Sequence, residues 1–234
     1  MGKRILNLSL IFIFLQQVGC EGQIPKMSRA DSTSIRYVAL GDSYTICEGA
    51  NEAESWPVNL SAHCISNQIS VSLIANPSRT GWTSQQLIEM ELPVFDRSDA
   101  DVVTLLIGVN DWVQGVTAAM FHKNLNFILD YLQSKLIKKG NILLITIPDF
   151  GVTAIGKLYS GGRDISKGIT EFNEVIKTEA AKRNLPIVDI FVLSKNMGVD
   201  ESLVAADGLH PSAKEYAAWE KIIFPVFFKM INVK

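Results

Sequence analysis

Two polar segments near opposite ends of the chain carry side chains that can perform nucleophilic catalysis. Ser43 follows Gly41 and Asp42 directly after an apolar run, and a serine at such a strand-to-helix turn can expose its hydroxyl for attack. Asp207 stands three residues before His210, a spacing at which the carboxylate can fix the imidazole tautomer and stabilise the imidazolium. Each segment is also typical of an ordinary polar turn. Together they offer a nucleophile, a base and a residue that orients the base.

Two further segments offer hydrogen-bond donors for a developing negative charge. Gly81 lies in the segment SRTGW, and Asn110 lies in the segment GVND. A free backbone N–H at Gly81 and the side-chain amide of Asn110 are donors of the kind that stabilise a tetrahedral oxyanion. Each is an unremarkable turn when taken alone. Their joint placement after predicted strands favours the catalytic interpretation.

Five short apolar runs predict the strands that must position these segments. Between the runs, apolar residues recur at spacings of three and four, from Phe121 to Leu136 and from Ile169 to Ile176, which predicts helices packed on a sheet. Strands that alternate with helices indicate a parallel sheet covered on both faces, with its site in the loops after the strands. The predicted strands are residues 35–40, 69–75, 102–107, 142–147 and 186–191.

Two helix starts carry capping-box signals. Thr83 with Gln86, and Ser212 with Glu215, are each three residues apart, as a capping box requires. The second pair predicts that the last helix begins directly after the His210 segment.

The four polar segments together resemble the SGNH, or GDSL-type, hydrolases. Ser43, Gly81, Asn110 and His210 are the four residues that name that family, and they occur in the family's order over residues 37–212. The resemblance implies a three-layer α/β/α sandwich with a five-stranded parallel sheet of flavodoxin-like form. Tyr44 stands where the family commonly has leucine, a departure that bears on the substrate rather than on the chemistry.

The resemblance also implies a role for each candidate residue. Ser43 would be the nucleophile, His210 the base and Asp207 the residue that orients it. The oxyanion hole would consist of the Ser43 and Gly81 N–H groups and the Asn110 amide. The expected enzyme is a cofactor-independent serine hydrolase that cleaves carboxylic esters through an acyl-serine intermediate.

Apolar side chains near the catalytic segments predict the kind of ester. The substrate-binding candidates are Trp112, Val113, Phe150 and Val152, with Leu158 and Tyr159 in the same long segment after the fourth strand. An apolar wall offers a sugar hydroxyl no hydrogen bond, whereas it favours an acyl chain. We therefore expect short to medium acyl esters, with lysophospholipids and thioesters in the same range. The alternatives are a carbohydrate O-deacetylase of the same family and a non-catalytic secreted binding protein.

Composition argues against several other classes of protein. The chain has 234 residues, 47% hydrophobic and 20% charged, which is typical of one globular domain. Its net charge of −2 gives no electrostatic case for a nucleic acid partner. Gly-x-Ser-x-Gly and Gly-x-Gly-x-x-Gly are absent, which argues against an α/β-hydrolase and a dinucleotide-binding protein. No protein partner is inferred.

The three cysteines do not form a metal-site pattern. Cys20, Cys47 and Cys64 match none of the paired spacings of zinc sites, so no structural metal is expected. In an oxidising compartment Cys47 and Cys64 could form a disulfide or remain buried thiols, and we favour thiols.

The N-terminus reads as a targeting segment. Lys3 and Arg4 precede about 11 apolar residues, too few to span a bilayer, which predicts a signal peptide over residues 1–19. Gly19-Cys20 resembles the end of a bacterial lipobox, although Gln17 stands where leucine is usual. We expect export as a lipoprotein anchored at Cys20 or as a secreted or periplasmic protein, with a polar tether over residues 20–34 and the hydrolase domain over 35–234. Any membrane association would come from that lipid anchor alone.

Overall fold

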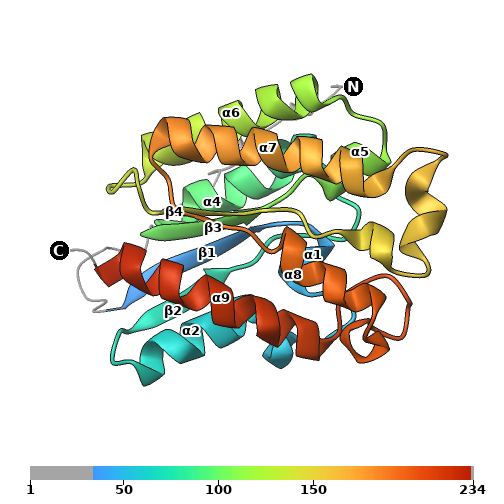
Figure 1. Ribbon diagram of the computed structural model, residues 1–234. Coiled ribbons are helices and arrows are strands. Elements are labelled where there is room, and N and C mark those ends of the chain that lie inside the picture. The colour runs from blue at the N-terminus through green and yellow to red at the C-terminus, as the bar shows by residue number, and fades with distance from the viewer. Residues whose placement is uncertain (1–33, 233–234) are drawn as a thin grey trace, which may run out of the picture.

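Five parallel strands form one sheet in the computed structural model, which describes residues 34–232. The strand order β2-β1-β3-β4-β5 places β1 and β3 side by side near the middle (Figure 1). The predicted parallel sheet and three-layer fold are thereby confirmed. The strands are β1 (Ile35–Gly41), β2 (Val71–Ala75), β3 (Val102–Leu106), β4 (Ile142–Ile145) and β5 (Ile187–Val188).

Burial follows the position of each strand in the sheet. Every residue of β3 and β4 is buried, as expected when helices cover both faces of a parallel sheet. In β1 even Tyr37 is fully buried, and its hydroxyl forms a 2.7 Å hydrogen bond with the Thr104 hydroxyl of β3. The edge strand β2 instead exposes Ser72 and Ile74.

Two predicted strands end two or three residues earlier than their apolar runs, at Ile145 and Val188. After β4, the Ile147 N–H donates to Asn173 Oδ1 at 2.7 Å, and the Ile147 carbonyl accepts from the same side-chain amide at 2.9 Å. After β5, Asp189 Oδ1 accepts from the Phe191 N–H at 3.0 Å and turns the chain into a short helix. Side chains thus replace the neighbouring strand as hydrogen-bond partners, which the apolar pattern alone does not reveal.

Helices cover both faces of the sheet. Figure 1 shows α4 (Leu92–Ser98), α6 (Ala118–Lys135) and α7 (Ile165–Arg183) on one face, and α2 (Trp56–Ser66) and α9 (Ala213–Asn232) on the other. The predicted apolar stripes of α6 and α7 face the core: Phe121, Leu125, Ile128, Leu132, Ile169, Phe172 and Ile176 are all buried. The shorter elements are α1 (Ser43–Ile46), α3 (Ser84–Gln86), a π turn η2 (Leu87–Glu91), α5 (Val109–Val113), α8 (Phe191–Ser194) and the 3₁₀ turns η1 (Glu52–Glu54), η3 (Phe150–Val152), η4 (Gly156–Ser160), η5 (Lys195–Gly198) and η6 (Glu201–Leu203).

One predicted capping box is present and the other is wrong. Thr83 and Gln86 form the reciprocal bonds of a capping box at the start of α3. Helix α9 begins at Ala213, directly after Ser212, but the Ser212 N–H donates to the Leu203 carbonyl at 2.8 Å. The Glu215 carboxylate instead accepts from the Trp219 indole N–H at 2.7 Å. The backbone donor that Glu215 would need is already occupied.

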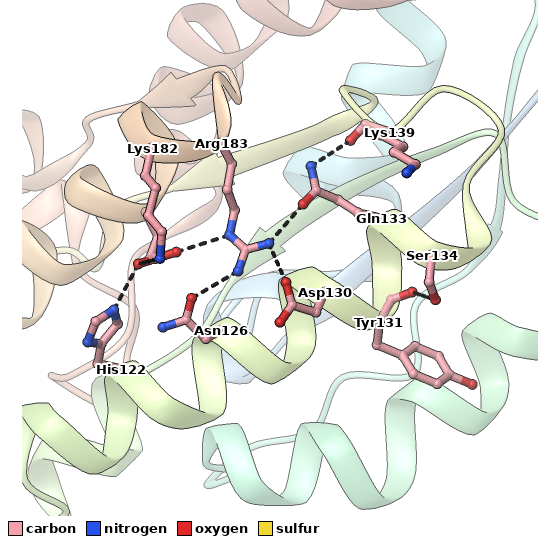
Figure 2. A network of polar contacts seen from close by, with 10 residues as sticks. His122, Asn126, Asp130, Tyr131, Gln133, Ser134, Lys139, Lys182 and Arg183 are labelled. Carbon is pink, nitrogen blue, oxygen red and sulfur yellow. Dashed lines mark hydrogen bonds and ion pairs between the residues drawn. The ribbon is translucent and has the colours of Figure 1, made fainter.

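A polar network ties α6 to α7 (Figure 2). The Glu179 carboxylate of α7 is buried and bonds to His122 Nε2 at 2.8 Å and to Arg183 Nε at 3.0 Å. The Arg183 guanidinium continues the network to α6, where it donates to Asp130 at 2.7 Å and to Asn126 at 2.9 Å. These charged hydrogen bonds stabilise the packing of α6 against α7. His122 therefore has a structural role.

The predictions for the N-terminal segment lie outside the described residues; these are the signal peptide, the lipidation of Cys20 and the tether up to residue 33. None of the helices in 34–232 is both long and apolar enough to cross a membrane. Cys47 and Cys64 are buried free thiols, in agreement with the favoured interpretation.

Candidate active site

The turn after β1 presents Ser43 at the carboxyl edge of the sheet. Asp42 caps α1 by accepting from the Tyr44 N–H at 3.0 Å, so the helix begins at Ser43. Gly41 is required by close packing, because a Cβ there would lie 2.1 Å from Thr45 Oγ1 and 2.2 Å from the Leu106 carbonyl. This tight turn places Ser43 just beyond the end of β1, where it lines a cavity with residues from the loops that follow other strands.

Asp207 and His210 form a closed loop before α9. Asp207 Oδ1 accepts from the backbone N–H groups of Leu209 and His210, both at 2.9 Å. Its second oxygen, Oδ2, lies 2.6 Å from His210 Nδ1. Burial alone would raise the pKa of Asp207, but the His210 ring and the two backbone donors outweigh it and lower that pKa. The carboxylate is therefore ionised, and it leaves Nε2 as the ring nitrogen available for proton transfer.

Short helix α5 holds the Gly81 loop. Asn110 Nδ2 donates to the Trp82 carbonyl at 3.0 Å, and Gln114, the residue directly after α5, donates to the Gly81 carbonyl at 3.1 Å. Gly81 has a φ of +83°, in the left-handed region that favours glycine, and no atom lies within 4 Å of the place a Cβ would occupy. The Gly81 backbone is thus open on the side where a Cβ would lie. The carbonyls of Gly81 and Trp82 accept hydrogen bonds from Gln114 and Asn110. No pattern in the sequence predicted this role for Gln114.

These segments meet around one cavity of about 200 Å³. Ser43, Gly81, Asn110 and His210 all contribute to its wall, although they come from four separate segments of the chain. Asp207 does not line the cavity, but it contacts His210, which does. The lining residues are Ser43, Tyr44, Thr80, Gly81, Val109, Asn110, Val113, Phe150, Tyr159, Leu209 and His210.

The predicted apolar wall divides into two groups. Val113 and Phe150 line the cavity, together with Tyr159. Trp112, Val152 and Leu158 do not: Trp112 is buried, Val152 packs on Gly198, and Leu158 is 76% exposed. Of the side chains predicted to form the wall, Trp112, Val152 and Leu158 thus lie outside this cavity.

Packing explains why Trp112 turns away from the cavity. The ring lies against Gly168 of α7, where a Cβ would be only 1.8 Å from Trp112 Nε1. The Arg163 guanidinium covers the ring at 3.9 Å and donates to the Trp112 carbonyl at 2.8 Å, while Phe150 meets it edge-on at 5.9 Å. Trp112 therefore supports Phe150 from behind.

Four lining residues were not predicted, and each lies close in sequence to one that was. Tyr44, Thr80 and Leu209 are neighbours of Ser43, Gly81 and His210, and Val109 precedes Asn110. The Tyr44 ring meets the His210 ring edge-on at 5.9 Å. Adjacency in sequence to a candidate residue was the signal that could have identified these four lining residues.

Two buried acids support the loops around the cavity from inside. Burial, partly offset by the Tyr44 N–H and reinforced by Asp111, raises the pKa of Asp42 to about 8. Burial also raises the pKa of Asp111, which accepts from the Ser84 N–H at 2.8 Å and from the Ser84 hydroxyl at 2.5 Å. Asp111 thereby joins α5 to α3. Within residues 34–232 there is no cluster of three or more metal-ligating side chains.

Comparison with known proteins identifies the class to which this site belongs. Residues 39–218 match the model of the GDSL-like lipase/acylhydrolase family. The chain belongs to that family. A stretch of 119 residues, 50% of this chain, is 34% identical to a multidomain esterase of Ruminococcus flavefaciens, of which it spans only 14%.

Solved structures share the fold at low sequence identity. TesA is 21% identical, with a TM-score of 0.66 over 83% of this chain and 99% of its own. The psychrotrophic esterase EstA from Pseudoalteromonas sp. is 21% identical, with a TM-score of 0.64 over 85% of this chain and 99% of its own. Axe2, an acetylxylan esterase from Geobacillus stearothermophilus, is 18% identical, with a TM-score of 0.63 over 86% of this chain and 97% of its own.

Proposed function

We propose that the protein hydrolyses carboxylic esters of short acyl groups through an acyl-Ser43 intermediate. The observation that carries the proposal is the 2.6 Å contact between His210 Nδ1 and Asp207 Oδ2, with His210 and Ser43 lining one cavity. A histidine oriented in this way beside a serine hydroxyl has the arrangement of a base and its nucleophile.

In the proposed mechanism His210 moves one proton through each half of the reaction. His210 Nε2 takes the Ser43 proton as Oγ attacks the carbonyl carbon, and the imidazolium then gives that proton to the leaving alcohol as the ester bond breaks. A water molecule, deprotonated by His210, attacks the acyl-enzyme, and the imidazolium returns that proton to Ser43 Oγ as the acid is released. The Ser43 and Gly81 N–H groups and the Asn110 amide stabilise the oxyanion in both halves.

The size and lining of the cavity favour a short acyl group. About 200 Å³ is small beside the roughly 300–1,000 Å³ of pockets that hold drug-sized ligands. Val109, Val113, Phe150 and Leu209 give the cavity an apolar part, and each methylene buried there contributes about 0.8 kcal/mol, or roughly a fourfold preference. The rate should therefore rise from acetyl to butyryl esters and fall once the chain exceeds the cavity.

Carbohydrate O-deacetylation is the second candidate function. It is favoured by the small cavity and by Tyr159, a 45% exposed aromatic side chain in the cavity wall on which a sugar ring can stack. The acetylxylan esterase Axe2 has a related fold. Efficient deacetylation of xylan without any gain from acetyl to butyryl esters would select this alternative.

Two measurements test the proposal. Ser43→Ala should abolish both ester hydrolysis and labelling by a fluorophosphonate probe, with an unchanged circular dichroism spectrum; labelling of the variant would exclude Ser43 as the nucleophile. In a series of acyl esters, Val113→Asp should flatten the rise from acetyl to butyryl. Val199→Asp is the matched control, because Val199 is 87% exposed and does not line the cavity.

A further inference from the structure

Glu91 is a fully buried carboxylate that the proposed mechanism does not use. It ends the π turn η2, in which the Leu92 N–H bonds back to the Leu87 carbonyl. Such wide turns are rare; they occur mostly inside helices and are frequent at functional sites. The sequence around it, QQLIEMELPVF, predicts a solvent-facing glutamate as readily as a buried one, so only the structure places it behind the catalytic loops.

One oxygen of Glu91 joins two catalytic loops. Oε2 accepts from the Gly41 N–H at 3.0 Å, and it has a longer contact of 3.5 Å with the Ser78 hydroxyl. Gly41 lies two residues before Ser43, and Ser78 lies three residues before Gly81. The carboxyl group therefore sits between the segments that carry the two backbone donors of the proposed oxyanion hole.

The sheet explains why Gly41 needs this acceptor. The pairing of β1 with β2 ends at Val38 and Ala75, whereas β1 continues to Gly41 beside β3. The Gly41 N–H is thus beyond the last residue of β2 and would be buried without a partner, at a cost of about 1–3 kcal/mol. Glu91 supplies the acceptor that the missing strand residue would have offered.

Two other contacts join the same loops nearer the surface. Asn76 Nδ2 donates to the Thr45 carbonyl at 3.0 Å, and the Thr80 hydroxyl donates to Glu48 Oε2 at 2.6 Å. Glu91 is the buried member of this set. Burial, with the charge of Asp42 nearby, raises the pKa of Glu91 well above its usual range. A neutral carboxyl group still accepts hydrogen bonds, so a glutamine of the same shape can replace it.

We propose that Glu91 is a positioning residue that fixes the Ser43 N–H relative to the Gly81 N–H by accepting hydrogen bonds from both loops. This inference rests on the proposed function, because the two N–H groups matter only when an oxyanion forms between them. Their separation affects the transition state more than the bound ester. Loss of the acceptor should therefore lower kcat and leave KM nearly unchanged.

The test compares Glu91→Gln with Glu91→Met in the full-length protein. Glutamine keeps an acceptor, so kcat with a butyryl ester should stay within about threefold of wild type. Methionine removes the acceptor, so kcat and the rate of fluorophosphonate labelling should fall roughly tenfold or more. The KM of Glu91→Met should stay within about threefold of wild type. Glu179→Met is the control, since it removes a buried carboxylate far from the cavity and should lower stability without lowering kcat.

The outcomes separate this inference from the proposed function. A wild-type protein without ester hydrolysis or labelling would overturn both. If the wild type is active, an unchanged kcat in Glu91→Met, or equal loss in Glu91→Gln and Glu91→Met, overturns the positioning role alone. If Glu91→Met does not fold, Ser78→Ala decides: a two- to fivefold fall in kcat supports the role, and an unchanged kcat overturns it.

Discussion

Replacement of Asn110 by alanine separates a catalytic contribution from a structural one. Asn110 Nδ2 carries two hydrogens, and the bond to the Trp82 carbonyl at 3.0 Å uses one of them. The other is the proposed donor to the oxyanion. Loss of one such donor lowers kcat by about 10²–10³, equivalent to roughly 2.7–4 kcal/mol of transition-state stabilisation. KM should change little, because the charge on the oxygen develops only in the transition state.

The structural part of the effect should be much smaller. Loss of the bond to Trp82 removes about 1 kcal/mol of stability, because Gln114 still holds the neighbouring Gly81 carbonyl. For a domain of this size that lowers Tm by roughly 2–4 °C. Asn141→Ala is a matched control: Asn141 Nδ2 donates to the Asp101 carbonyl, also at 3.0 Å, away from the cavity.

The assay is steady-state hydrolysis of a chromogenic butyryl ester, with thermal unfolding of the same samples. Asn110→Ala should lose kcat, Asn141→Ala should not, and both should show similar small falls in Tm. A value of kcat in Asn110→Ala within about threefold of wild type would refute the assignment of Asn110 to the oxyanion hole. Equal losses of kcat in the two variants would show that the effect follows stability.

Two further predictions concern charged pairs. Asp207→Asn should keep the bonds from the Leu209 and His210 N–H groups, but it presents an amide to His210 Nδ1 and so disfavours the required tautomer. In the ester assay kcat should fall by roughly 10²–10⁴. A loss below tenfold would contradict the role of Asp207. The pKa of Glu179 is lowered to about 2, because the bonds from His122, Arg183 and Lys182 outweigh its burial. Since that pKa is below the unfolded value, Glu179 stabilises the fold above about pH 4.5 and this stabilisation is lost as pH falls towards 2. Urea unfolding at pH 7 should show that the free energy of unfolding of Glu179→Gln is about 1–3 kcal/mol below that of the wild type. At pH 3 this difference in the free energy of unfolding should be smaller. An equal difference at the two pH values would contradict the argument.

The sequence by itself determined the sheet and the candidate catalytic residues. The apolar runs and helical spacings are local properties of the chain, and they predicted five parallel strands with helices between them. Because parallel strands end at one edge of the sheet, the turns after them had to meet there. That topological rule brought Ser43, Gly81, Asn110 and His210 to one cavity without any knowledge of side-chain packing.

Only the tertiary structure decided which neighbouring side chains face the cavity and which support it. Trp112 turns away because Gly168 and Arg163, both more than 50 residues later, form the space it fills. Glu91 reaches Gly41 because β2 ends before β1 does, and no local pattern encodes the relative ends of two strands. The Ser212 capping box failed because the Ser212 N–H already had a partner in Leu203. Each of these outcomes depends on contacts between segments distant in sequence, and such contacts exist only once the chain has folded.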